Sequence, residues 1–347
     1  MMIDNLAGLA ERRLDNGLLG QWYILAKSSQ LADKPLGVRA LGRDLVLWRG
    51  EDNMVRCLDD RCPHRGAPLS RGQMAGNHVA CQYHGVQVDG DGVIARVPAL
   101  ANCALEGRKA VQAYMVEEHE DGVFVYFPSA EQPVAPPLAL PVELHDPEFA
   151  TFLCTATWDT NYRYVLDNLV DPMHGIYLHA DTFTLSEGLT EDLVSVQKTP
   201  GGFVILRRGQ QGLNFDKAEI DYENGLIYGR VEIPYPPAGG PGGMMRVLAM
   251  VTPIDLTRCQ IFFWRCRRLS GLTRDTWRFM YRAAFEQRHW DVLEQDREML
   301  AAMPNDARDH ELLYQHDLGV GNLRRALGRK ALSQVAAEMP LAAHAAE

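Results

Sequence analysis

Two short pairs of residues combine the side chains that bind transition metals. Cys62 and His64 form the pattern C-x-H, and after sixteen further residues Cys81 and His84 form the pattern C-x-x-H. Each pair offers one thiolate and one imidazole, so two loops lying side by side would present two sulfur and two nitrogen donors. This is the donor set of a [2Fe–2S] cluster in which two histidines replace two cysteines on one iron. The neutral imidazoles raise the reduction potential of such a cluster.

A structural zinc site is the alternative interpretation of the same four residues. Tetrahedral Zn²⁺ also accepts two cysteines and two histidines. Zinc fingers, however, usually group cysteine with cysteine and histidine with histidine. Each pair in this chain mixes one of each, and this mixed order favours the iron–sulfur cluster.

A second group of possible metal ligands contains His174 and His179. They are five residues apart, a spacing that rotates their side chains by about 140° on an ideal α-helix. A helix would therefore have to break or bulge between them if both bind one metal, and Gly175 is where a break is expected. Two imidazoles and one carboxylate form the facial triad of non-heme Fe(II) oxygenases, which leaves positions open for O₂ and substrate. Two ordinary histidines at a helix end are the alternative.

Both groups of residues resemble motifs of the bacterial Rieske non-heme iron oxygenases. The sequence R-C-P-H-R-G-A-P-L at residues 61–69, followed by C-Q-Y-H-G at 81–85, is similar to their cluster-binding loops. The pattern N-x-x-D-x-x-H-x-x-x-x-H at 168–179 is similar to their iron-binding motif. Gln82 and Val86 depart from the family, in which Pro and Trp are common at these positions. The resemblance covers nearly the whole chain and is greatest to the vanillate O-demethylase, dicamba monooxygenase and saxitoxin-type hydroxylase group of terminal oxygenase (alpha) components.

The resemblance implies that the carboxylate ligand comes from a helix far along the chain. The sequence V-L-E-Q-D-R-E-M-L at residues 292–300 matches the family's context for this ligand. Asp296 is the expected ligand, with Glu294 as its competitor and Asp291 as the third choice. All three acids lie on a charged helix, where a solvated acid is the ordinary explanation.

The resemblance also assigns roles to two polar residues that precede the histidines. Asp171 matches a family residue that contacts the iron ligand of its own subunit, here His174, and a cluster histidine of the neighbouring subunit, here His84 or His64. Electrons would then cross the interface between subunits. Capping of a helix end is the alternative role for Asp171. Asn168 is similar to a family residue close to the iron.

The pattern of elements predicts an α+β protein of two domains. The chain has 347 residues, enough for two domains of ordinary size. Residues 1–128 are rich in short strand patterns and are expected to form an all-β Rieske [2Fe–2S] domain. Residues 129–141 contain four prolines and are expected to be a linker or a surface-crossing connection. Residues 142–347 are expected to form the catalytic domain with the mononuclear iron, and the resemblance implies the helix-grip fold, an antiparallel sheet with helices.

Within residues 142–347, strand patterns alternate with three helical patterns, at residues 161–175, 273–303 and 324–338. The Pro- and Gly-rich segment 235–243 is expected to be a loop, either a plain hairpin connection or a lid at the mouth of the pocket. The aromatic candidates for the pocket, which have plain core as their alternative role, are Phe203, Phe215, Phe262 and Trp264.

Composition limits the partners and the compartment. The formal net charge is −10, which argues against nucleic acid or an anionic membrane as a partner. No segment approaches the ~18 consecutive apolar residues of a membrane span. Five cysteines remain besides the cluster ligands, and this odd number without a framework spacing indicates reduced thiols in a cytoplasmic protein.

The resemblance implies the terminal oxygenase component of a multicomponent monooxygenase, an oxidoreductase that depends on NAD(P)H through a separate flavin- or ferredoxin-type reductase. Such an enzyme uses O₂ for hydroxylation or for oxidative O- or N-demethylation of a small aromatic or heterocyclic substrate. A homotrimer with electron transfer between subunits is expected. The alternatives are a ring-dihydroxylating dioxygenase of the same family, a Rieske electron carrier and a redox sensor. The carrier is disfavoured because a second metal motif lies outside residues 1–128.

Overall fold

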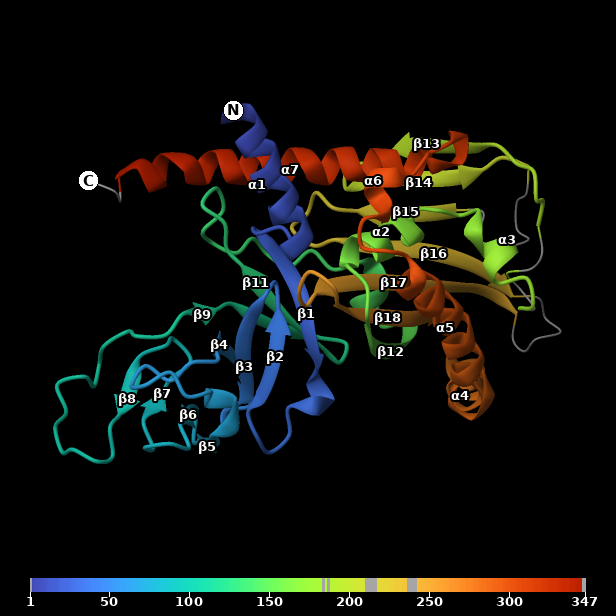
Figure 1. Ribbon diagram of the computed structural model, residues 1–347. Helices are drawn as coiled ribbons and strands as arrows, with labels where there is room; N and C mark the ends of the chain where they lie inside the picture. The colour runs from blue at the N-terminus through green and yellow to red at the C-terminus, as the bar shows by residue number, and fades with distance from the viewer. Residues whose placement is uncertain (1, 183–184, 186–187, 210–216, 236–241, 345–347) are drawn as a thin grey trace.

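The computed structural model describes residues 2–182, 185, 188–209, 217–235 and 242–344, and Figure 1 shows their arrangement. The strands of the N-terminal part are β1 (Gln21–Lys27), β2 (Leu36–Ala40), β3 (Arg43–Arg49), β4 (Val55–Asp59), β5 (Gln73–Ala75), β6 (His78–Ala80), β7 (Gln87–Val88), β8 (Ile94–Arg96), β9 (Ala113–Tyr114), β10 (Val116–His119) and β11 (Gly122–Phe127). They form small antiparallel sheets in the orders β1-β11-β10, β2-β3-β4-β9 and β5-β6-β7-β8. The short, strand-rich N-terminal part is as the sequence predicts.

The C-terminal part contains one large antiparallel sheet. Its strands are β12 (Phe149–Trp158), β13 (Val194–Lys198), β14 (Gly202–Arg207), β15 (Lys217–Asp221), β16 (Tyr228–Tyr235), β17 (Gly243–Pro253) and β18 (Cys259–Arg268). Within the described residues their order is β12-β18-β17-β16-β15-β14-β13. Most strands that are neighbours in this sheet are also neighbours along the chain. The exception is the edge strand β12, which pairs with β18 in one register from Phe149 opposite Arg268 to Trp158 opposite Cys259. The α+β prediction is confirmed.

The helices are α1 (Met2–Asn16), α2 (Tyr162–Leu169), α3 (His174–Leu178), α4 (Gly271–Met280), α5 (Glu286–Ala302), α6 (Ala307–His310) and α7 (Leu318–His344). A π-helical turn, Tyr281–Phe285, joins α4 to α5, so the helix predicted over 273–303 is continuous but changes its phase once. The helix predicted over 161–175 is two helices. Residues 236–241 of the predicted loop lie outside the described residues. None of the helices described here has the length and apolar content that a membrane span needs.

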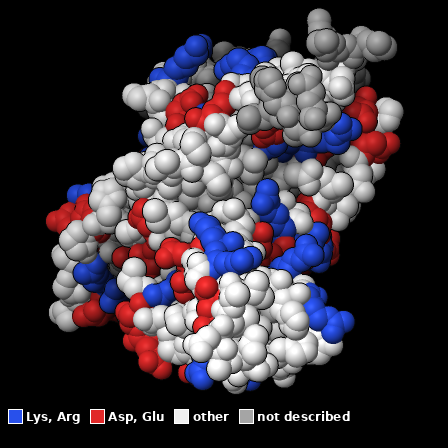
Figure 2. Space-filling model, turned by 90° about the vertical axis from the view of Figure 1, so that its left-hand side faces the viewer, with Lys and Arg blue, Asp and Glu red and all other residues white. Residues whose placement is uncertain are grey.

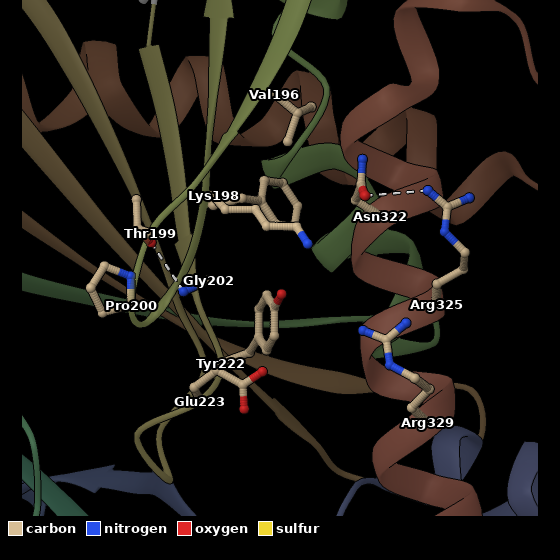
Figure 3. A pocket seen from close by; sticks show the side chains of 11 residues that line it. Val196, Lys198, Thr199, Pro200, Gly202, Tyr222, Glu223, Asn322, Arg325 and Arg329 are labelled. Carbon is tan, nitrogen blue, oxygen red and sulfur yellow. Dashed lines mark hydrogen bonds between the residues drawn. The ribbon is translucent and has the colours of Figure 1, made fainter.

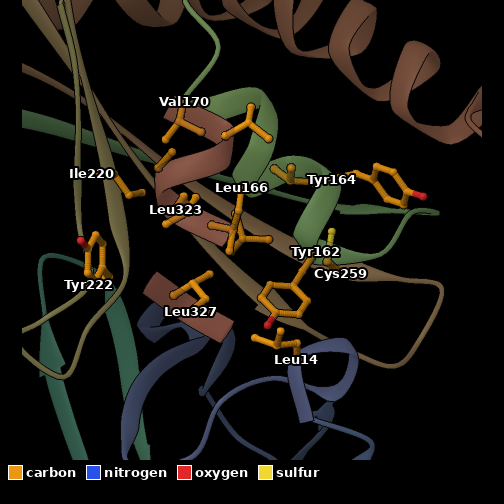
Figure 4. Close-up of a cluster of buried hydrophobic side chains, with 14 of the residues drawn as sticks. Leu14, Tyr162, Tyr164, Leu166, Val170, Ile220, Tyr222, Cys259, Leu323 and Leu327 are labelled. Carbon is orange, nitrogen blue, oxygen red and sulfur yellow. The ribbon is translucent and has the colours of Figure 1, made fainter. Parts of the chain in front are cut away.

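One face of the large sheet is covered by helices. Ile261 and Phe263 of β18 belong to a core with Leu166 of α2, Leu323 of α7 and Leu14 of α1 (Figure 4). Helices α1 and α7 come from the two ends of the chain and pack against each other (Figure 1). Helix α1 was not predicted from the sequence; it lies within residues 1–128 but packs on the C-terminal part.

The opposite face of the large sheet is covered by the N-terminal strands. Phe262 and Trp264 of β18 share a core with Trp22 of β1 and Phe124 of β11. The rings of Phe124 and Trp264 are stacked, with centroids 6.2 Å apart, and the indole N–H of Trp264 donates to the carbonyl of Glu120 at 3.0 Å. Because β18 is buried on both faces, its sequence shows no alternation of polar and apolar residues. The two parts of the molecule are therefore joined by a continuous apolar core.

The proline-rich segment 129–141 contains no regular element among its residues. The indole N–H of Trp22 donates to the Pro136 carbonyl at 3.0 Å, and the Tyr126 hydroxyl donates to the Gln132 carbonyl at 2.9 Å. These bonds hold the segment against the core between the sheets. Of the two expected forms, the segment is a surface-crossing connection rather than a free linker.

Replacing Trp264 by alanine should lower the free energy of unfolding by about 3–5 kcal/mol, because the change empties a fully buried aromatic site between two sheets. Urea denaturation followed by circular dichroism measures this loss. The matched control is Phe279→Ala on α4, whose side chain is 74% exposed and should change stability by no more than about 0.5 kcal/mol. A loss below about 1 kcal/mol for Trp264→Ala would contradict the conclusion that Trp264 stabilises the core between the two sheets.

Candidate active site and metal centres

The two Cys–His pairs lie on loops of matching geometry. The Gly66 N–H donates to the Cys62 carbonyl at 2.9 Å, and the Gly85 N–H donates to the Cys81 carbonyl at 2.8 Å. In both loops the cysteine N–H donates to the carbonyl five residues further on. Gly66 and Gly85 have φ values of +74° and +71°, a conformation that side chains other than glycine rarely adopt. The two loops therefore present their side chains in the same way.

The loops direct sulfur inward and imidazole outward. Cys62 and Cys81 are each 2% exposed, whereas His64 and His84 are exposed and their ring centroids lie 4.6 Å apart. Burial raises the pKa of the Cys62 thiol, to which the nearby Cys81 adds. A thiolate at this depth therefore needs a positive partner, which the iron of a cluster supplies. The donor set and its burial fit a [2Fe–2S] cluster whose imidazole side faces the surface.

The second group of ligands depends on the end of α2 and the short helix after it. Helix α2 begins where the Asn161 side chain accepts from the Arg163 N–H, and it ends at Leu169. Helix α3 begins at His174 and ends at Leu178, so His179 lies just beyond it with φ −104° and ψ 29°. The break expected at Gly175 is absent, because Gly175 lies inside α3. The backbone instead leaves helical geometry at Val170 and again at His179.

His174, His179 and Asp296 converge. The Oδ1 atom of Asp296 lies 3.5 Å from Nε2 of His174 and 3.4 Å from Nε2 of His179. The candidate ligand atoms of the three residues all lie within 4.8 Å of one another. Atoms bound to one ion at about 2.1 Å, with angles between octahedral and tetrahedral, lie about 3.0–3.4 Å apart. The spacing therefore fits one metal ion.

Hydrogen bonds on the far side of each ring define which nitrogen is available. His174 Nδ1 is 2.6 Å from the Asp171 carbonyl, and His179 Nδ1 is 2.8 Å from Oε1 of Gln295. A carbonyl oxygen only accepts, so each Nδ1 carries the proton and each Nε2 offers a lone pair. The two lone pairs face the Asp296 carboxylate. Such a set of acceptors is stable only with a positive charge between them.

The electrostatics of this group agree with that conclusion. Burial lowers the pKa of His179, but its hydrogen bond to Asp296 and the charge of that carboxylate outweigh burial, so the pKa is raised above its ordinary value. The side chains of His179 and Asp296 are only 2% and 9% exposed. A proton or a metal cation relieves the same buried negative charge, and two imidazoles with one carboxylate suit Fe(II).

Two polar residues support the three candidate ligands. The Asn168 side-chain N–H donates to Oδ1 of Asp296 at 3.2 Å. Gln295, which the sequence did not single out, precedes Asp296 on α5 and fixes the ring of His179 as described above. The Asp171 carboxylate lies 3.9 Å from Nδ1 of His174 and accepts from the Met173 N–H at 2.9 Å. Asp171 thus contacts His174 mainly through its backbone carbonyl, while its carboxylate accepts from the backbone of the residue that precedes α3.

The competing acids on α5 point elsewhere. Glu294 is 52% exposed in its side chain and forms an ion pair with Arg297. Asp291 is exposed and accepts from the side chain of Gln287 at 3.0 Å. Neither belongs to the group formed by the two histidines and Asp296 within the described residues.

A cavity of about 650 Å³ opens beside these residues. One wall is the concave face of the large sheet, the opposite wall is α5, and α2 and α3 close one end. This volume lies within the range of about 300–1,000 Å³ that small-molecule sites occupy. The apolar lining residues include Leu185, Val231, Ile233, Met245, Val247, Phe263, Phe285 and Val292.

Three of the four aromatic residues singled out in the sequence are described by the structure, and none of these three lines the cavity. Phe262 and Trp264 point to the opposite face of the sheet, and Phe203 belongs to the helix-covered core. Phe215 lies outside the described residues. Phe263, the neighbour of both Phe262 and Trp264, lines the cavity instead. Strand alternation decides which of them faces inward, and a strand buried on both faces does not reveal its phase.

Comparisons with known proteins agree with this geometry. A model of the Rieske [2Fe–2S] domain matches residues 21–115. The chain is 30% identical over 270 residues to the oxygenase component of dicamba O-demethylase from Stenotrophomonas maltophilia, covering 72% of this chain and 78% of that protein. This chain belongs to the Rieske oxygenase family. It is an oxygenase component, and the family's [2Fe–2S] cluster and mononuclear iron are its cofactors.

Further similarities of this Rieske oxygenase are more distant. It is 32% identical over 167 residues to the vanillate O-demethylase oxygenase subunit of a Pseudomonas species, an alignment that spans about half of each chain, 48% and 46%. The oxygenase in the complex with ferredoxin of carbazole 1,9a-dioxygenase has a TM-score of 0.71 at 19% identity, covering 95% of this chain and 94% of the other. At that identity the likeness shows the fold alone.

Two polar residues of the cavity were missed in the sequence. Arg265 lies on β18 next to Phe263, and His289 lies on α5. Burial and then the charge of Arg265 lower the pKa of His289 to about 3, so this imidazole is neutral at physiological pH. A run of four residues containing three arginines, Arg265–Arg268, gives no indication of which one faces a cavity.

A separate surface pocket of about 560 Å³ lies between the turn that joins β13 to β14 and helix α7 (Figure 3). Lys198, Tyr222, Arg325 and Arg329 point toward its interior (Figure 3). None of the metal-ligand candidates lines it. The two arginines on α7 are exposed, and a solvated basic surface accounts for them.

Replacing His289 by glutamine should reduce the sensitivity of folding to acid. The folded pKa is about 3, whereas an unfolded histidine titrates near 6.5. Between these values the unfolded chain binds a proton that the folded chain does not, so this contribution to stability is complete above about pH 6.5 and is lost as the pH falls. At pH 5 the variant should lose about 1–2 kcal/mol less than the wild type, relative to pH 7.5.

Urea denaturation at the two pH values measures this difference. The control is His310→Gln, since His310 is 76% exposed in its side chain and should behave like the wild type. An equal acid sensitivity of the wild type and His289→Gln would contradict a His289 that stays neutral in the folded protein.

Proposed function

We propose that this protein is the terminal component of a multicomponent Rieske monooxygenase. The proposed cluster ligands are Cys62, His64, Cys81 and His84. The proposed ligands of the catalytic iron are His174, His179 and Asp296. The observation that carries the proposal is the convergence of two imidazole nitrogens and one carboxylate oxygen at the edge of an apolar cavity of about 650 Å³.

The residues around the metal would hold it open to O₂ on the cavity side. Bound iron would supply the activation of O₂, with electrons delivered through the cluster. Asp171 and Gln295 would keep the Nδ1 protons of the two histidines in place, and Asn168 would orient the Asp296 carboxylate. Such partners commonly change metal affinity or activity by about 10–100-fold. The apolar walls would hold the substrate and exclude water from the reacting carbon.

The proposed reaction is hydroxylation, or oxidative O- or N-demethylation, of a small aromatic or heterocyclic substrate. Insertion of one oxygen atom into a methyl C–H bond gives a hemiacetal or hemiaminal, which collapses to formaldehyde and the demethylated product. The two curated relatives described above are named O-demethylases, which supports this class. Ring dihydroxylation is the alternative within the family. An electron carrier or redox sensor would have no use for the cavity beside the histidines.

A homotrimer with electron transfer between subunits is part of the proposal. In Figure 1 the strands β5–β8, which flank the cluster loops, lie on the opposite side of the molecule from α3 and α5. The two proposed metal centres of one chain are therefore far from each other. Asp171 is one-third exposed, and the exposed side chains of Tyr177 and Tyr314 lie near it. Burial and then the charge of Asp171 raise the pKa of Tyr314. This surface suits a neighbouring subunit's exposed His64 and His84.

Electrons would come from a flavin- or ferredoxin-type reductase. The exposed Arg61 and Arg65 flank the ligands Cys62 and His64 in the sequence. Figure 2, which faces the end of the molecule that carries β5–β8, shows Lys and Arg side chains gathered above a rounded region with few charged residues. Basic side chains beside a region with few charges suit an acidic electron-transfer protein.

The proposal includes the domain division 1–128, 129–141 and 142–347. Helix α1 is the exception, because it packs with α7 and thus with the second domain. The five cysteines outside the cluster, like the cluster cysteines, form no disulfide. This supports a reducing, cytoplasmic location.

Replacing Asp296 by alanine should empty the mononuclear site. Two imidazoles alone bind Fe(II) poorly, so iron content should fall from about three to about two per chain, the two of the cluster, and substrate-dependent O₂ consumption should cease. The absorption spectrum of the cluster should be unchanged. Glu294→Gln, two residues away, is the matched control and should keep its iron. Retention of the third iron and of turnover in Asp296→Ala would move the ligand elsewhere and contradict the proposed centre.

Replacing Asp171 by asparagine should leave both metals bound but slow electron transfer between them. Asparagine keeps the backbone carbonyl that fixes His174 but loses the charge toward the neighbouring subunit. Oxidation of the reduced cluster in a single turnover, in the presence of substrate and O₂, should slow by about 10–100-fold. Asp306→Asn, at a side chain that is 65% exposed, is the control. An unchanged rate for Asp171→Asn would contradict the bridging role.

A further inference from the structure

One side chain of the cavity carries a buried charge for which the described residues supply no carboxylate partner. Arg265 is 3% exposed and lines the cavity. It lies on β18 opposite Val247 of β17 and Phe152 of β12. It is two residues after Phe263, so both side chains lie on the helix-covered face of the sheet.

The contacts of Arg265 are weak. Its Nη1 atom lies 3.5 Å from the Phe263 carbonyl, and its guanidinium lies 5.6 Å from the centroid of the Phe263 ring. Within the described residues no carboxylate oxygen lies within 4.0 Å of it. Other arginines inside the fold do have such partners: the partly buried Arg230 contacts Glu143 at 3.0 Å, and the buried Arg207 contacts Asp192 at 3.4 Å. A guanidinium has five N–H donors. Most of the hydrogen-bonding capacity of Arg265 therefore has no partner among the described residues.

The groups that face Arg265 do not supply a counter-charge. His289, on the opposite wall, is neutral at physiological pH, as described above. Four acids line the cavity, and each has another contact or is exposed. Asp296 faces the two histidines, and the Asp171 carboxylate accepts from the Met173 N–H. Asp181 and Asp291 are exposed. Burial of a cation without a counter-charge is strongly unfavourable. The cavity therefore favours an anion, and iron bound at Asp296 would add further positive charge.

We propose that Arg265 is a substrate-binding residue that pairs with a carboxylate, and that the substrates of this oxygenase are aromatic or bulky apolar carboxylates. The carboxylate would lie against Arg265 between β18 and α5. The apolar body would lie against Val247 and Met245, with the carbon to be oxidised beside the three proposed iron ligands. This inference rests on the proposed function, because it assigns the substrate class of the same cavity.

The shape and the lining of the site select a carboxylate over a phosphate. The flat fork of one guanidinium matches the two oxygens of one carboxylate. Phosphate sites use several cations or a cluster of backbone N–H groups. The sheet wall around Arg265 is otherwise apolar, and the second arginine that lines the cavity, Arg288 on α5, is exposed. The volume of about 650 Å³ suits a molecule of one or two rings.

The test is anaerobic equilibrium dialysis of the holoenzyme with three matched probe sets. These are meta-methoxybenzoate and a methoxynaphthoate, their neutral methyl esters, and the corresponding sulfonates. The wild type should bind at least one carboxylate about tenfold or more tightly than its ester. Arg265→Gln should weaken carboxylate binding by about 30-fold or more while ester affinity changes by less than about threefold. Arg265→Lys, which keeps the charge but loses the fork, should lie between them.

Arg268→Gln is the matched control, because Arg268 lies on the same strand but is 57% exposed in its side chain and pairs with Asp146 and Glu148. It should bind the carboxylates like the wild type. Three results would overturn the inference: no carboxylate of the panel binds, Arg265→Gln binds carboxylates like the wild type, or sulfonates bind as tightly as carboxylates.

Failure of the proposed function would look different. Iron content and O₂-dependent product formation are measured on the same samples. If the anion subsite is wrong but the proposed function is right, the third iron and oxidation of bound esters persist without any preference for carboxylates. If the proposed function is wrong, no bound probe is oxidised, even where the dependence of carboxylate binding on Arg265 is intact.

Discussion

The Asp296 carboxylate faces the Nε2 lone pairs of two histidines inside the protein, at 3.5 and 3.4 Å. The Nδ1 protons of both rings are committed to the Asp171 carbonyl and the Gln295 side chain. Three acceptors in a buried site repel one another unless a cation lies between them. The need for that cation gives the site its chemistry, and the surrounding cavity gives it a substrate.

The architecture brings this group together from distant parts of the chain. The histidines follow α2, and Asp296 lies on α5, and both helices pack on the same face of the large sheet. Strand β18 runs through the centre of this arrangement. Its Phe262 and Trp264 pack against the N-terminal strands, while its Phe263 and Arg265 line the cavity. One strand therefore joins the cluster-bearing part to the catalytic part and also shapes the substrate site.

The local motifs were readable from the sequence because their ligands are close together along the chain. The spacing of Cys62 with His64 and of Cys81 with His84 predicts the two cluster loops, and glycines at positive φ explain why each loop can turn. The choice between Asp296 and Glu294 was not decided by the residues themselves, since both lie on one charged helix. It depends on which side of α5 faces the sheet, and therefore on tertiary packing.

Other features depend even more on packing. Helix α1 packs against α7 from the other end of the chain, a contact between segments that are far apart in the sequence. The break between the histidines was expected at Gly175, but α3 instead ends just before His179. Arg265 is indistinguishable in the sequence from the exposed Arg268. Only the register of β18 buries the first and exposes the second.

Crystal diffraction recorded at the iron absorption edge tests the central claim most directly. We predict one anomalous peak within bonding distance of Nε2 of His174, Nε2 of His179 and Oδ1 of Asp296. Two closely spaced peaks should lie between the loops that carry Cys62 and Cys81. An iron peak in the cavity that is not bound by Asp296, or the absence of iron from this site in active protein, would contradict the assignment.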